Sequence, residues 1–93
     1  MTGMGIEISD IRIREIPDSG KLKAVASITL NGVFAIHDIK IIQGDKRWFV
    51  AMPSRKNATD GTYMDTCHPL DQNTRMYIQE RILDAYFGMV AVR

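Results

Sequence analysis

The side chains best suited to covalent or metal chemistry lie close together in one segment, at Asp65, Cys67 and His68. A zinc site generally needs three or four protein ligands, and this chain has 1 cysteine and 2 histidines. A Cys67 nucleophile activated by His68 is also disfavoured, because adjacent side chains of an extended segment point to opposite sides. We therefore expect no catalytic site, no metal and no cofactor. A hydrolase or metal enzyme built on Cys67 and His68 is the least favoured hypothesis.

His37 and Asp38 are the other adjacent pair that could exchange a proton. Neighbouring residues of a strand point to opposite faces, so His37 would lie among apolar side chains while Asp38 pointed away. We interpret His37 as a core histidine hydrogen-bonded to a neighbour, not as a general base.

Positive charge is concentrated in the middle of the chain, although the net charge is only +1. Residues 40–56 contain five cations and the single acid Asp45. Such a block can produce a local positive patch on a nearly neutral protein. A solvated surface edge is the commoner explanation for charge of this density, and it stays open as an alternative.

Three cations are the candidate contacts to a phosphate backbone. Arg55 and Lys56 begin a polar segment from which long side chains can reach a ligand, and Arg75 falls in the first turn of a predicted helix. Free backbone N–H groups and the helix dipole favour an anion at that position. Such contacts would give affinity and salt dependence but little sequence recognition. For Arg75, an ion pair with Asp71 or Asp65 is the competing interpretation.

The elements that position these cations begin with a hairpin. Asn31-Gly32 between two apolar runs predicts a two-residue type I′ turn, which pairs Leu30 with Val33. With this register one face carries His37 and nine apolar residues: Leu22, Ala24, Ala26, Ile28, Leu30, Val33, Ala35, Ile39 and Ile41. We expect that face to pack in the core.

The opposite face of this hairpin carries a smaller apolar cluster of Val25, Phe34 and Ile36. An exposed cluster of this kind needs a cover. We predict that a second copy of the chain supplies it, so that these three residues form a dimer interface.

Residues 6–14 predict another strand, in which the apolar residues change phase near Ser9-Asp10. A β-bulge at that point would restore a single buried face. Arg12 and Arg14 would then point together to the other side of the sheet.

The C-terminal half predicts a strand over 48–52, a flexible loop over 53–62 and a short strand around Tyr63 and Met64. A helix follows, with Asp71 as its N-cap and Gly88 as its stop. The predicted fold is therefore α+β, an antiparallel β-sheet of four to five strands followed by a C-terminal α-helix. We expect a single domain over 1–93, with a leader (1–5), a sheet (6–52), the loop (53–62) and the helix (71–87).

Composition agrees with a folded domain, because 45% of the residues are hydrophobic and 25% are charged. No apolar run approaches the ~20 residues of a membrane span, and the N-terminus lacks the layout of a signal peptide. We expect a cytoplasmic protein that does not insert into a membrane.

Several motifs occur together along the chain: Asp10–Arg14, Ile36–Asp38, Phe49–Lys56, Asp60-Gly61 and Cys67–Leu70. In order and spacing they resemble the SpoVG family, which is stage V sporulation protein G and the bacterial septation proteins. The resemblance covers roughly residues 6–87. It implies a small α+β domain that forms a homodimer.

The resemblance also implies a non-enzymatic regulator of septation and sporulation-type gene control that binds DNA or RNA. In the family, the basic pair after the Met-Pro-Ser motif and the start of the helix are associated with nucleic-acid contact, which here means Arg55, Lys56 and Arg75. Met64 stands where the family commonly has a basic residue. The alternative function is a protein-interaction module of the division machinery, which would bind an acidic partner through the same patch without specific nucleic-acid binding.

Overall fold

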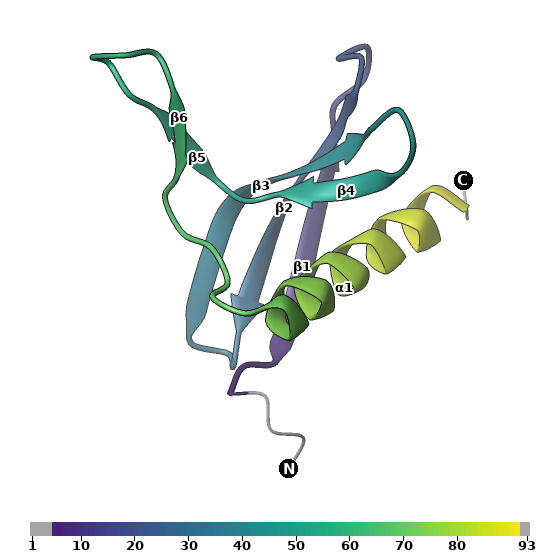
Figure 1. Ribbon diagram of the computed structural model, residues 1–93. Coiled ribbons are helices and arrows are strands. Elements are labelled where there is room, and N and C mark those ends of the chain that lie inside the picture. The colour runs from purple at the N-terminus through teal and green to yellow at the C-terminus, as the bar shows by residue number, and fades with distance from the viewer. Residues whose placement is uncertain (1–4, 92–93) are drawn as a thin grey trace.

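The computed structural model describes residues 5–91, which form two antiparallel sheets and a helix (Figure 1). The larger sheet has the order β1-β2-β3-β4, made of Ile8–Glu15, Leu22–Leu30, Phe34–Gln43 and Trp48–Ala51. The smaller sheet pairs β5 (Ser54–Lys56) with β6 (Tyr63–Asp65), and α1 spans Gln72–Ala91. The predicted α+β class is confirmed. Of the predicted leader 1–5, all but Gly5 lies outside the described residues.

The core lies between α1 and one face of the four-stranded sheet (Figure 1). Alternate residues of β2 and β3 meet helix residues spaced by four, which is the spacing that keeps side chains on one helix face. The buried side chains of this layer are Ile8, Ala24, Ala26, Ile28, Ile39, Ile41, Ile78, Ile82 and Tyr86. Trp48 of β4 extends the layer, with its ring centroid 5.6 Å from that of Tyr86. We call the sheet face opposite α1 the open face, because no helix covers it within residues 5–91.

The predicted β-bulge at the start of β1 is confirmed. The ladder between β1 and β2 shifts register between Ile8 and Asp10, so that Ser9 is the extra residue. After the bulge, the isoleucines of β1 pack against the core. Arg12 and Arg14 alternate with them and therefore lie on the open face, as predicted.

The predicted register of the β2–β3 hairpin is wrong by one residue at the turn. Leu30 pairs with Phe34 and not with Val33, so the connection has three residues. The backbone N–H of Asn31 donates to the Glu7 carbonyl at 2.8 Å, and its Oδ1 accepts from the Glu7 N–H at 2.8 Å. These bonds attach the turn to the segment that leads into β1. The Asn31-Gly32 dipeptide could not predict these bonds, because they join residues 24 positions apart in the sequence.

The predicted core position of His37 is also wrong, because β3 contains a bulge. The β2–β3 ladder shifts register between Ala26 and Ile28, so that His37 and Asp38 together lie opposite Ser27. Asp38 has a left-handed φ of 64°. His37 is exposed on the open face, where its Nδ1 lies 3.0 Å from the Ser27 hydroxyl.

The same bulge separates the three residues of the predicted dimer interface. Ile36 pairs with the buried Ile28 and packs against the core, and Phe34 pairs with Leu30 on that side of the sheet. Val25 lies on the open face. The three residues therefore do not form the predicted single patch, and the homodimer itself stays a prediction.

The helix begins as predicted and ends later than predicted. The Asp71 carboxylate accepts a hydrogen bond of 2.6 Å from the Thr74 N–H, which is the contact of an N-cap. α1 continues through Gly88 to Ala91, so the predicted stop is wrong. Met89 packs against the core in the extra turn, and this burial favours the longer helix.

Candidate nucleic-acid interface

β5 and β6 form a hairpin that projects from the end of β4, away from α1 (Figure 1). Its base is closed by Thr66, whose N–H and hydroxyl donate to the Pro53 carbonyl at 2.8 and 3.1 Å. The predicted short strand around Tyr63 and Met64 is confirmed within β6. The loop predicted over 53–62 is shorter than expected, because β5 occupies Ser54–Lys56 and pairs with β6, while residues 57–62 form the connection.

The tip of the hairpin is fixed by its own polar groups. The Asp60 carboxylate accepts hydrogen bonds from the Thr62 N–H at 3.0 Å and from the Thr62 hydroxyl at 2.7 Å. These bonds, the backbone one first, hold the pKa of Asp60 below its ordinary value. Gly61 has a φ of 76°, a conformation that glycine adopts without steric cost. These bonds and the Gly61 conformation fix the turn, and the turn sets the register between β5 and β6.

Arg55 and Lys56 leave the hairpin on opposite faces. Neighbouring strand residues alternate, and Arg55 lies across from Met64 while Lys56 lies across from Tyr63. All four side chains are exposed, Tyr63 to 69% and Met64 to 64%. Each face therefore presents a cation beside an exposed aromatic or thioether side chain.

This pairing can bind a single-stranded nucleic acid by two different forces. Cations neutralise phosphates, and exposed aromatic rings stack on bases without regard to sequence. The pattern of residue types identified Arg55 and Lys56 but missed Tyr63. The pairing of Tyr63 with Lys56 depends on the β5–β6 register. Its only sequence signal is an aromatic residue within an otherwise polar segment.

A groove borders the hairpin. Its lining residues are Arg55, Lys56, Asn57, Ala58, Met64, Asp65 and Thr66. The two cations give it positive charge, and Asp65 offsets part of that charge. The groove contains no residue of α1.

Arg75 is exposed in the first turn of α1 and does not line the groove that Arg55 and Lys56 border. The structure therefore does not bring the three predicted contacts into one cluster. Within residues 5–91, Arg75 makes no ion pair with Asp71 or Asp65. The Asp71 carboxylate already accepts from the helix N-terminus, and the backbone N–H of Thr74 holds the pKa of Asp71 below its ordinary value.

Cys67 and His68 lie between the hairpin and α1. Cys67 is half-buried, and both residues line a small, mainly apolar pocket with Met52, Ile36 and Ile78. His68 Nδ1 lies 3.0 Å from the Pro69 carbonyl, just before the start of α1. In the described part of the chain, no three His, Cys, Asp or Glu side chains are grouped so that they could hold a metal.

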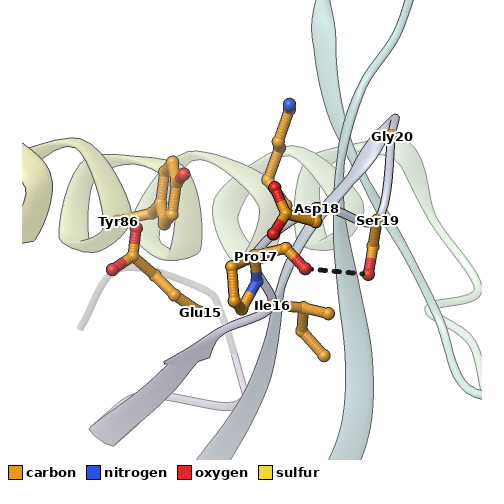
Figure 2. A pocket seen from close by; sticks show the side chains of 8 residues that line it. Glu15, Ile16, Pro17, Asp18, Ser19, Gly20 and Tyr86 are labelled. Atoms are coloured by element: carbon orange, nitrogen blue, oxygen red, sulfur yellow. Dashed lines mark hydrogen bonds between the residues drawn. The ribbon is translucent and has the colours of Figure 1, made fainter.

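A second hollow lies beside the turn between β1 and β2 (Figure 2). It is lined by residues 15–20 together with Lys23 and Tyr86. The Ser19 hydroxyl donates to the Pro17 carbonyl at 3.5 Å inside the turn. This hollow holds none of the candidate phosphate contacts.

No helix within residues 5–91 is both long enough and apolar enough to cross a membrane.

The chain matches the SpoVG family over residues 6–88. A protein of Agathobacter rectalis named "Putative septation protein SpoVG" is 53% identical over 81 residues, covering 87% of this chain and 92% of the relative. Proteins of the same name from Acetivibrio thermocellus and Lachnospira eligens are 49% and 48% identical. They cover 92% and 87% of this chain, and 90% and 91% of their own lengths.

Proposed function

The chain belongs to the SpoVG family, and from that premise we propose that it regulates septation and sporulation-type gene expression by binding DNA or RNA. Its binding element is the β5–β6 hairpin. The observation that carries this proposal is the cross-strand pairing of an exposed cation with an exposed ring, Lys56 with Tyr63.

The hairpin suits a flexible, single-stranded ligand. Arg55 and Lys56 are exposed on opposite faces, so a strand that wraps the hairpin contacts both. Each phosphate that a cation neutralises adds about 0.7 to the slope of log affinity against log salt for single strands. Arg75 contributes a separate contact at the start of α1. Two copies in a homodimer would present the hairpin twice and raise affinity without a new type of contact.

The test compares the charge pair of the hairpin with a matched pair elsewhere. Arg55→Gln/Lys56→Gln removes two cations from the hairpin, and Lys46→Gln/Arg47→Gln removes two exposed cations between β3 and β4. We expect the hairpin variant to bind a random-sequence single-stranded pool about tenfold more weakly and with a salt slope smaller by about 1.4. Fluorescence anisotropy across a salt series measures both quantities.

The control variant should lose little affinity. Equal losses in the two variants would place the binding surface elsewhere. No binding by the folded wild-type protein at low salt would exclude the proposed function and favour the protein-interaction module. Sequences enriched from the pool at physiological salt would support a gene regulator over a non-specific binder.

A further inference from the structure

The open face of the four-stranded sheet carries a basic row across its centre. Arg14 pairs with Val25, and Val25 pairs with Lys40 on its other side. Because neighbouring strands lie about 4.8 Å apart, the Cα atoms of Arg14 and Lys40 are on the order of 10 Å apart. Neither cation forms an ion pair with another residue of 5–91. The row therefore presents two cations outside any ion pair of the described residues, and the nearby Asp38 carboxylate offsets part of their charge.

The bulge in β3 makes a hollow next to this row. Arg12 and Arg14 line one side of the hollow, and His37 and Asp38 line the other. Residues two apart on a strand are about 7 Å apart, so the two arginine side chains leave the same face of β1 at neighbouring positions. Asp10 holds the Arg12 guanidinium at 2.9 Å, which leaves the Arg14 group as the freer contact for an anion.

Half-buried apolar side chains lie among these charges. Val25 stands between Arg14 and Lys40, and Phe49 occupies the open face of β4 opposite Ile42. Bases stack on aromatic and apolar platforms, and phosphates need cations, so the face offers both kinds of contact.

The chain itself connects this face with the hairpin. Ala51 is the cross-strand neighbour of Lys40 at the end of β4, and Arg55 follows four residues later. Four residues of extended chain span about 13 Å. A single-stranded nucleic acid bound at the hairpin can therefore continue onto the open face without leaving the protein surface.

We propose that the open face, centred on Arg14 and Lys40, is a second contact surface for the nucleic-acid strand that the β5–β6 hairpin binds. This inference rests on the proposed function and extends the binding site beyond the hairpin. A second copy of the chain suits the face less well, because like charges would meet across a symmetric contact.

The experiment uses ligand length to separate the two surfaces. Arg14→Gln/Lys40→Gln is compared with wild type, with Arg55→Gln/Lys56→Gln and with the matched control Lys46→Gln/Arg47→Gln. Single-stranded oligonucleotides of about 6 and about 20 nucleotides are titrated against each protein. We expect the open-face variant to bind the long oligonucleotide about tenfold more weakly and the short one unchanged. The hairpin variant should weaken the binding of both.

Lys40 is half-buried, so Arg14→Gln alone is measured as a second variant, with circular dichroism to check the fold. The second surface would be overturned if the open-face variants bound the long oligonucleotide as tightly as the control variant while the hairpin variant bound it more weakly. The proposed function would still stand in that case. Absence of binding by wild type would overturn both. Equal affinity of wild type for polyglutamate would also overturn the inference and indicate an acidic protein as the occupant.

Discussion

Tyr63 is exposed to 69% on a hairpin that has no core of its own. A tyrosine ring stabilises a fold when it is buried, so the exposed ring of Tyr63 contributes little to packing. Its ring lies across from Lys56, where it can stack on a base while the ammonium group contacts a phosphate. At the scale of the single residue, this ring should contribute affinity through its π face and not through its hydroxyl.

We predict that Tyr63→Leu weakens single-stranded binding by about 1–3 kcal/mol, the range for loss of one aromatic stack. Tyr63→Phe should retain wild-type affinity because it keeps the ring. Anisotropy titrations of the three proteins with one oligonucleotide check this prediction. If the leucine variant binds as tightly as wild type, the hairpin contacts phosphates only.

The β-bulges show how far the elements follow from residue patterns. In β1 the change of apolar phase near Ser9 predicted a bulge, and the structure has one. The apolar residues of β3 change phase in the same way between Ile36 and Ile39, and there a bulge also occurs. The bulge in β3 was not predicted, because the Asn31-Gly32 turn was assumed to have two residues and to be followed by one continuous register.

The N-terminus of α1 carries a pH dependence with a definite sign. Bonding to Thr74 lowers the pKa of Asp71 from 3.8 in the folded chain. A lowered folded-state pKa means that the stabilisation is present above about pH 3.8 and is lost as the pH falls through the folded value. We predict that Asp71→Ala lowers the melting temperature by a few degrees at pH 7, and by less at pH 2.

Asp71→Asn is the matched control, because asparagine also caps helices but does not titrate in this range. It should melt close to wild type at pH 7 and show a flatter profile in acid. Thermal melts followed by circular dichroism from pH 2 to pH 7 measure all three proteins. An alanine variant whose deficit is the same at both ends of the range would mean that the charge of Asp71 plays no part.

For the whole molecule, the residue patterns predicted the α+β class and the buried alternation of β2. They also predicted that Arg12 and Arg14 share a face. They could not predict that Arg75 lies outside the groove of Arg55 and Lys56, because the position of that groove depends on how the β5–β6 hairpin projects after β4. Charge along the chain identified candidate cations, but only the three-dimensional arrangement divides them between the hairpin, the open face and the start of α1.

That arrangement also makes the predicted homodimer testable, because its proposed contacts now lie on different faces. Phe34 is 62% exposed on the helix side of the sheet, and Val25 is half-buried on the open face. We predict that Phe34→Ser weakens dimerisation about tenfold, as expected when roughly 1.4 kcal/mol of apolar contact is lost, and that Val25→Ser does not. Light scattering over a micromolar concentration series measures the dissociation.

A monomeric wild-type protein would remove the homodimer from the proposed function. Dissociation caused by Val25→Ser alone would instead identify the open face as the contact between copies. In that arrangement Arg14 and Lys40 would be covered, and a nucleic-acid strand could not reach them. The same pair of variants therefore decides whether the open face of the sheet binds a second copy of the chain or stays free for a nucleic acid.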